Sequence, residues 1–127
     1  MNEPVPTVLV ADDDPDIREL VAFKLEQAGY RVHAVGDGEA ALAAAAALAP
    51  DLLLLDVMMP GINGFEVCRR LRAQDDTAAI HVIMLTARAQ ESDVETGFAV
   101  GVEDYIAKPF SPRELLTRVN NVLARIS

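Results

Sequence analysis

Residues 52–56 have the sequence LLLLD, four leucines in a row followed by an aspartate. A strand with one exposed face alternates apolar and polar residues, whereas a continuous apolar run predicts a strand that is covered on both faces. Such strands are typical of parallel sheets packed between helices. Asp56 ends the run, and an aspartate at the end of a buried strand is unfavourable unless it is paired or functional. The stretch therefore predicts both a fold class and a candidate functional residue.

Four further short apolar runs predict strands elsewhere in the chain, at residues 7–11, 31–35, 81–86 and 104–107. Apolar residues at helical spacing follow each predicted strand. The predicted helices run from Asp14-Pro15 to Ala28, Asp37 to Ala49, Gly64 to Ala73, Glu91 to Val100, and Ser111 to Ile126. Five strands alternating with five helices predict an α/β fold, in which right-handed crossovers build one parallel sheet with helices on both faces.

Two of these helices carry clear capping signals. At the first helix, Asp14 can cap the free amide groups, Pro15 suits the first turn, and Gly29 ends the helix. The last helix opens with Ser111-Pro112-Arg113-Glu114, a capping box with proline at the first helical position.

Composition excludes several functional classes. The chain has 127 residues, 51% of them hydrophobic, which suits one folded domain. Eleven basic and twenty acidic residues give a formal net charge of 11 − 20 = −9, so we expect no direct binding to nucleic acid or to an anionic membrane. The single cysteine excludes an internal disulfide. With only two histidines beside it, the chain cannot supply the usual four-ligand zinc site.

The sequence contains no targeting signal that we recognise. Its first residues lack the basic segment and apolar run of a signal peptide. The longest apolar stretch, before Pro50, is about half the length needed to span a bilayer. We expect a cytoplasmic protein with a short tail at residues 1–6 and one domain at residues 7–127.

Polar side chains follow the predicted strands at their carboxyl ends, where open parallel sheets form their sites. In chain order they are Asp12, Asp13, Asp14, Asp56, Thr86 and Lys108. Carboxylates held close together repel one another and need compensation. Mg²⁺ is suited to that role because it prefers a few carboxylates together with water and phosphate oxygens.

Some of these residues have an adequate structural explanation. Asp14 caps the first helix, nearby Asp16 favours its dipole, and threonine is common in strands. The adjacent acids Asp12-Asp13 and the buried Asp56 are harder to explain without a function.

A carboxylate can attack phosphorus and form an aspartyl phosphate. Phosphoryl transfer needs mainly positioning and charge neutralisation. The sequence offers an acid nucleophile in Asp56, a hydroxyl in Thr86 and an ammonium group in Lys108 for these tasks.

Four motifs, in this order, resemble the receiver domain of two-component response regulators, including the chemotaxis regulators. They are Val10-Ala11-Asp12-Asp13-Asp14, Leu55-Asp56-Val57-Met58-Met59-Pro60-Gly61, Leu85-Thr86-Ala87 and Tyr105-Ile106-Ala107-Lys108-Pro109-Phe110. The resemblance extends from about Thr7 to Ile126. It implies a flavodoxin-like doubly wound sheet with strand order 2-1-3-4-5.

The resemblance also implies a role for each site residue. Asp56 would accept a phosphoryl group from a phosphohistidine on a sensor histidine kinase or a histidine phosphotransfer protein. Mg²⁺ would be bound by Asp13 and Asp56, by Asp12 through water, and by the backbone carbonyl of Met58. Lys108 would pair with the phosphoryl group, and the Lys108-Pro109 peptide bond is expected to be cis.

The family further implies a phosphorylation-dependent switch rather than a turnover enzyme, with only intrinsic autophosphorylation and autodephosphorylation. Thr86 would reorient toward the phosphoryl group, and Tyr105 would turn inward with it. The surface formed by residues 91–100, 104–107 and 111–126 would change and could support a homodimer. In the winged-helix subfamily that dimer is charged; Asp104, Glu114 and Arg118 match its pattern, whereas Gln90 and Val94 replace its basic partners.

Three alternatives share parts of this pattern. A flavodoxin-type flavin protein would need a hydroxyl- and glycine-rich phosphate loop where Asp12-Asp13-Asp14 stands. An aspartyl-phosphate phosphohydrolase would place a second acid at position 58, which is a methionine. A receiver that takes no phosphate could act as a docking module only. We assign no catalytic role to Cys68, His33 or His81, and the sequence names neither a downstream effector nor an attached output domain.

Overall fold

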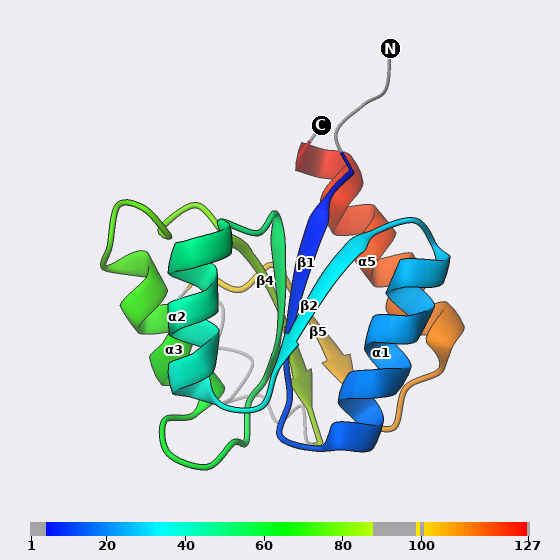
Figure 1. Ribbon diagram of the computed structural model, residues 1–127, viewed down its shortest axis with the longest axis horizontal. Coiled ribbons are helices and arrows are strands. Elements are labelled where there is room, and N and C mark those ends of the chain that lie inside the picture. Colours follow the sequence, from blue (N-terminus) through cyan, green and yellow to red (C-terminus); the bar gives the residue numbers. More distant parts are fainter. Residues whose placement is uncertain (1–4, 88–98, 100, 127) are drawn as a thin grey trace.

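The computed structural model describes residues 5–87, 99 and 101–126, and Figure 1 shows a central sheet with helices on both faces. The strands are β1 (Thr7–Ala11), β2 (Arg31–Val35), β3 (Leu52–Asp56), β4 (His81–Thr86) and β5 (Asp104–Ala107). All pairs are parallel and the order is β2-β1-β3-β4-β5. The predicted strand positions and the predicted strand order are therefore confirmed.

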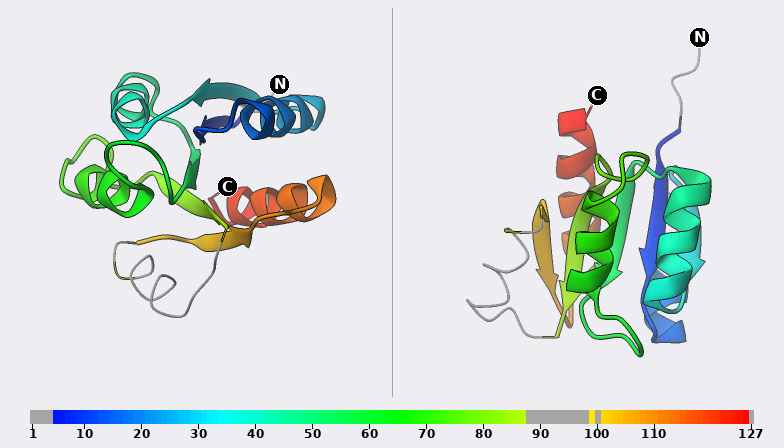
Figure 2. Two further views of the ribbon diagram at one scale, coloured as in Figure 1. Left: turned by 90° about the horizontal axis from the view of Figure 1, so that it is seen from below. Right: turned by 90° about the vertical axis from the view of Figure 1, so that its left-hand side faces the viewer.

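Among the residues that the structure describes, two helices cover each face of the sheet. Helices α1 (Pro15–Gln27) and α5 (Pro112–Ile126) pack on one face, and α2 (Gly38–Leu48) and α3 (Gly64–Arg72) pack on the other, as both views in Figure 2 show. The helix expected at 91–100 lies outside the described residues except for Ala99. The helices predicted to end at Ala28, Ala49 and Ala73 were each too long at that end, because these residues are caps, and Asp37 is likewise a cap.

The leucine run of β3 lies at the centre of the core, as the sequence predicted. All five residues of the strand are buried. Leu53 and Leu55 pack with α2 and α3, whereas Leu52 and Leu54 pack with α1 and α5. This alternation follows from the two-residue period of a strand and explains why both sets of side chains are apolar.

Strand register brings the carboxyl ends of four strands to one edge. Ala11 pairs with Leu55, Asp56 pairs with Leu85, and Thr86 pairs with Ala107. The last residues of β3 and β4, and the residues that directly follow β1 and β5, therefore lie in the same region. The edge is the one that the sequence predicted to carry the site.

The start of α3 is packed directly against this edge. The amide of Gly64 donates to the carbonyl of Val57 at 2.9 Å. A Cβ atom on Gly64 would lie 2.6 Å from the carbonyl oxygen of Asp56, which is too close for any side chain. Glycine at this position is therefore required by the close approach of the helix to the end of β3. Within the described part of the chain, no helix is long and apolar enough to cross a membrane.

Candidate functional site

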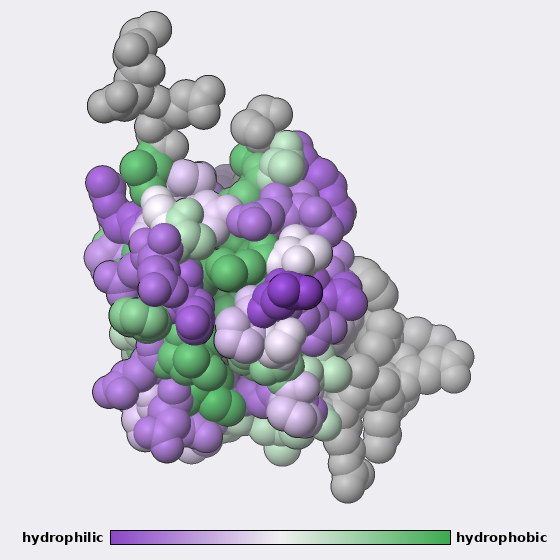
Figure 3. All heavy atoms as spheres, turned by 90° about the vertical axis from the view of Figure 1, so that its right-hand side faces the viewer, coloured by the Kyte–Doolittle hydropathy of each residue, from purple (hydrophilic) through white to green (hydrophobic). Residues whose placement is uncertain are grey.

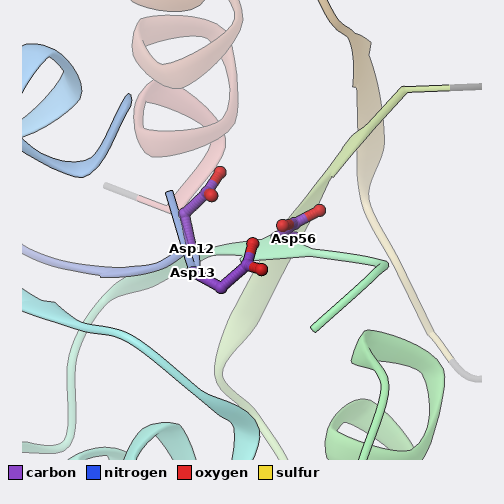
Figure 4. A group of neighbouring side chains, drawn as sticks. All are labelled: Asp12, Asp13 and Asp56. Atoms are coloured by element: carbon purple, nitrogen blue, oxygen red, sulfur yellow. The ribbon is translucent and has the colours of Figure 1, made fainter. Parts of the chain in front are cut away.

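Three aspartates from two neighbouring strands converge at the carboxyl edge of the sheet. Asp12 and Asp13 follow β1, and Asp56 is the last residue of β3. One carboxylate oxygen from each lies within 4.8 Å of the other two, and Figure 4 shows the three side chains grouped at the ends of the two strands. The residues that sequence analysis placed together are therefore adjacent in the structure.

Asp12 is fully buried, and its amide, its carbonyl and its carboxylate each form hydrogen bonds. Its amide donates to the carbonyl of Val35 at 3.2 Å. Its carbonyl accepts a 2.8 Å hydrogen bond from Arg18. Its carboxylate accepts from the amide of Asp14 and from the ammonium group of Lys108, at 2.9 Å and 2.8 Å. The start of the β1–α1 loop is thus anchored in four directions.

Asp56 is only 3% exposed, and its surroundings disfavour its charge. Burial, followed by the charge of Asp12, raises its pKa to about 7, and a hydrogen bond with Asp13 acts in the same direction. The nearby Lys108 and the amide of Met58, which donates to Asp56 at 3.2 Å, lower the pKa. The pKa of Asp56 is raised overall because burial and the two neighbouring acids outweigh the ammonium group of Lys108 and the amide of Met58.

Lys108 enters the site from the strand at the edge of the sheet. Its side-chain nitrogen lies 2.8 Å from Asp12 and 3.5 Å from Asp56. Burial opposes its charge, but the hydrogen bond with Asp12 and the two negative charges raise its pKa overall, so it remains an ammonium group. The Lys108-Pro109 peptide bond is cis, as expected.

Thr86 and Tyr105 lie on the two strands next to this ammonium group. Thr86 is buried at the end of β4, and its carbonyl accepts from the amide of Lys108 at 2.7 Å. Tyr105 is partly buried in β5 and packs against the cluster beneath α2 and α3. Since Tyr105 pairs with Met84, two residues before Thr86, the side chains of Thr86 and Tyr105 lie on the same face of the sheet.

The donor set fits a hard divalent cation. Carboxylate oxygens are ligands that Mg²⁺ prefers, together with water and phosphate oxygens, and the mutual repulsion of the acids is relieved when a cation is bound. Met58 lies two residues after the end of β3, so its backbone carbonyl belongs to the loop next to the acids. Its side chain is 71% exposed. A bound cation would lower the raised pKa of Asp56, because it would favour the ionised carboxylate.

Sequence analysis did not identify Arg18 as a site residue. This arginine stands on α1, one turn after the cap residue Asp14, and its guanidinium group reaches back to Asp12. Helical spacing gave no signal for this contact, because Asp12 lies six positions earlier and before the helix begins. The capping role predicted for Asp14 is confirmed, since its side chain accepts from the amide of Asp16 at 2.9 Å.

The residues to which we assigned no catalytic role lie away from the acids. Cys68 is fully buried among apolar residues of the core. His33 lies on the exposed side of β2. His81 begins β4, at the opposite edge of the sheet, and its ring lies 3.0 Å from Glu103.

The charged residues of the expected dimer pattern are paired within the chain. Arg118 on α5 donates to both carboxylate oxygens of Asp104 at 3.0 Å and lies 3.8 Å from Glu114. Gln90 and Val94 lie outside the described residues.

Comparison with known families identifies this arrangement. The sequence-family model of the response regulator receiver domain matches residues 8–120. The chain belongs to the response regulator receiver family. The acid cluster is therefore that of a receiver domain of two-component response regulators. The family expected from the four sequence motifs is confirmed.

Named relatives agree with this family. The chain is 48% identical over 121 residues to the DNA-binding dual master transcriptional regulator RpaA of Synechocystis, covering 95% of this chain and 50% of that protein. It is 46% identical to the phosphate regulon transcriptional regulatory protein PhoB of Pseudomonas aeruginosa, covering 94% and 52%. The chain therefore spans about half the length of the curated relatives it matches.

A solved structure gives the same result for the fold. The chemotaxis protein CheY4 of Vibrio cholerae has a TM-score of 0.90 and 35% sequence identity, with 94% of this chain and 99% of that chain covered. The flavodoxin-like, doubly wound architecture expected for a receiver domain is confirmed.

Proposed function

We propose that this receiver domain accepts a phosphoryl group on Asp56. A carboxylate oxygen of Asp56 attacks the phosphorus of a phosphohistidine, an O–P bond forms, and the P–N bond breaks as the imidazole leaves. The observation that carries the proposal is the position of Asp56, which is buried beside Asp12 and Asp13 and 3.5 Å from the ammonium group of Lys108. A purely structural aspartate would not be surrounded by two further acids.

Mg²⁺ is the cofactor that we propose for this site. Asp13 and Asp56 would bind it directly, Asp12 through water, and Met58 through its backbone carbonyl. When bound, the cation would neutralise the acids and orient the phosphoryl oxygens. The three neighbouring carboxylate oxygens support this assignment.

Lys108 and Thr86 would bind the transferred group, and Tyr105 would respond to it. The ammonium group of Lys108 already lies beside both buried acids, so it can pair with a phosphoryl oxygen without a large movement. The hydroxyl of Thr86 can donate to another oxygen. Thr86 and Tyr105 share one face of the sheet on adjacent strands, so a reorientation of Thr86 would change the space open to the Tyr105 ring.

The partner that we propose is a sensor histidine kinase or a histidine phosphotransfer protein, which docks on α1. Leu20 and Phe23 on this helix are 45% and 57% exposed, although they are large and apolar. Figure 3 shows apolar side chains gathered on the face that α1 and α5 form. The helix begins directly after the acids, so a partner bound to this face has access to Asp56.

A second proposed surface is the one that changes on phosphorylation; it rests on the family and on the charged pairs of α5. The surface of residues 91–100, β5 and α5 would change on phosphorylation and support a homodimer. We propose that residues 7–127 form the cytoplasmic receiver domain, that residues 1–6 are a tail, and that DNA binding, where the complete protein performs it, resides outside this domain. The net charge of −9 supports the last point.

Intact mass spectrometry after incubation with Mg²⁺ and a small phosphodonor tests the phosphoacceptor. Wild-type protein should gain the mass of one phosphoryl group, and removal of Mg²⁺ should suppress the gain. Asp56→Asn should gain none. Asp75→Asn changes an exposed aspartate away from the site and should behave as wild type.

Two results would contradict the proposal. One is equal phosphorylation of Asp56→Asn and wild type, which would place the phosphoryl group elsewhere. The other is repeated turnover of phosphomonoesters by the wild-type protein, which would indicate a phosphohydrolase.

A further inference from the structure

The loop that carries Asp12 and Asp13 is fastened by Arg18, a residue outside the acid cluster. Nη1 of Arg18 donates to the backbone carbonyl of Asp12 at 2.8 Å. Asp12 is fully buried, so its carbonyl needs a hydrogen-bond partner within the protein, and Arg18 supplies one. The guanidinium group therefore stabilises the backbone of the site, although it does not contact the three carboxylates.

A second element, the end of β2, confines the same guanidinium group. A Cβ atom on Gly36 would lie 3.0 Å from Nη1 of Arg18 and 3.7 Å from its Cζ. The preceding residue, Val35, accepts the amide hydrogen bond of Asp12 at 3.2 Å. Arg18 therefore fills the space between α1, the end of β1 and the end of β2.

These contacts leave Asp13 between two fixed points. On one side, the backbone of Asp12 is held by Val35 and Arg18. On the other side, the amide of Asp14 donates to the carboxylate of Asp12 at 2.9 Å. The direction in which the exposed Asp13 side chain leaves the backbone is set by this arrangement.

We infer that Arg18 is a positioning residue for the cation site, which holds the carbonyl of Asp12 so that the carboxylates of Asp12 and Asp13 converge on Asp56. The inference rests on the proposed Mg²⁺ site. Residues behind the metal ligands often control affinity, because they fix the orientation of the ligands.

Electrostatics and positioning predict opposite signs when Arg18 is removed. If Arg18 acted only through its positive charge, its removal would make the acid cluster more negative and tighten Mg²⁺ binding. If it holds the loop, its removal weakens binding despite the more negative site. The direction of the change therefore separates the two roles.

Mg²⁺ titration followed by ¹H–¹⁵N NMR measures this direction. Arg18→Met should raise the dissociation constant for Mg²⁺ about tenfold, and Arg18→Lys should give a smaller increase because it keeps the charge and one donor group. Arg31→Gln removes an equal charge from the exposed amino end of β2, about 13 Å along the strand from its carboxyl end, and should leave the constant unchanged.

Gly36→Ala tests the same contact from the other strand and keeps every charge. It should displace the guanidinium group and weaken Mg²⁺ binding about twofold to threefold, which is less than the loss of Arg18. In the double variant Arg18→Met/Gly36→Ala, the alanine should add no further effect, because its target is gone. Additive effects, or tighter binding in Arg18→Met, would overturn the inference.

A measurement without Mg²⁺ keeps the inference independent of the proposed function. Amide hydrogen exchange at Asp14, whose amide is bonded to Asp12, should accelerate in Arg18→Met and Gly36→Ala and not in Arg31→Gln, while the free energy of global unfolding changes little. Unchanged exchange at Asp14 would refute the positioning role. If wild type binds no Mg²⁺ and exchange still accelerates, the proposed cofactor is wrong and the role of Arg18 stands.

Discussion

The side-chain nitrogen of Lys108 lies 2.8 Å from a carboxylate oxygen of Asp12, although 96 positions separate the two residues in the sequence. The same nitrogen is 3.5 Å from Asp56. One positive charge is therefore shared by two buried acids, and this sharing determines how the site responds to mutation, pH and cations.

Substitution of Lys108 by methionine should raise the pKa of Asp56 above its value of about 7, because Lys108 is a group that lowers this pKa. The carboxyl carbon of Asp56 can be followed by ¹³C NMR during a pH titration without Mg²⁺. Lys24→Met removes an equal charge beside the ring of Phe23 on α1 and should leave the pKa of Asp56 unchanged. Equal titration curves for wild type and Lys108→Met would contradict this account.

Stability of the Mg²⁺-free protein should fall as the pH rises from about 4 to about 7. The pKa of Asp56 is about 7 in the folded protein and near its ordinary value of 3.8 in the unfolded chain. The folded protein therefore binds more protons within this window, and its free energy of unfolding decreases with pH, by at most about 1.4 kcal/mol per pH unit. Urea denaturation at a series of pH values measures this slope.

Asp56→Asn is the matched control for the pH dependence, because other titrating groups remain. Its free energy of unfolding should depend less steeply on pH between 4 and 7 than that of wild type. Saturating Mg²⁺ should flatten the wild-type curve as well, since a bound cation favours the ionised carboxylate. A wild-type slope identical to that of Asp56→Asn would show that Asp56 does not titrate in this window.

Gly64→Ala should destabilise the protein by about 1–3 kcal/mol, because the new methyl group meets the backbone at the end of β3 rather than a flexible side chain. The amide resonances of Asp56 and Val57 should shift as well. Gly29→Ala is a useful contrast: its methyl group would enter open space, and only the positive φ of 100° opposes it. That variant should lose stability without altering the resonances of the site.

Arg72→Met should lower the free energy of unfolding by about 2 kcal/mol or more, because three carbonyl groups lose a charged donor. The guanidinium group of Arg72 donates to the carbonyls of Ala78, Ile80 and Gly101 at 3.0, 2.7 and 2.7 Å. Arg69→Met on the same helix removes, within the described residues, an exposed ion pair with Glu66, and it should cost less than about 1 kcal/mol. Equal losses in the two variants would contradict the assignment.

Much of this structure follows from local sequence patterns. The strand bounds agree because each strand is a short apolar run between polar residues, and LLLLD is buried on both faces as predicted. Helix bounds were less accurate at residues 37–49 and 64–73, because a cap residue resembles the helix that it ends. Ala49 illustrates this limit: it is a strong helix former by type, yet it has a positive φ of 46° as the cap of α2.

Convergence of the acids was also predictable, since the carboxyl ends of parallel strands meet at one edge. What the sequence could not provide were the contacts that depend on side-chain reach. Arg18 returns to Asp12 across one turn of helix, and Arg72 joins three carbonyl groups that are up to 29 positions away. Neither residue belongs to a motif that we could interpret, because an arginine on a helix is most often solvated.

The strand order has a mechanical consequence for the site. β1 and β3 have a hydrogen-bonded neighbour on each side, whereas β5, within the described part of the chain, is joined to β4 alone. The three acids are thus carried by central strands, whereas Lys108 directly follows a strand with fewer hydrogen-bonded neighbours. We therefore expect a group bound in the pocket to displace β5, which has fewer hydrogen-bonded neighbours, more readily than the two strands that carry the acids.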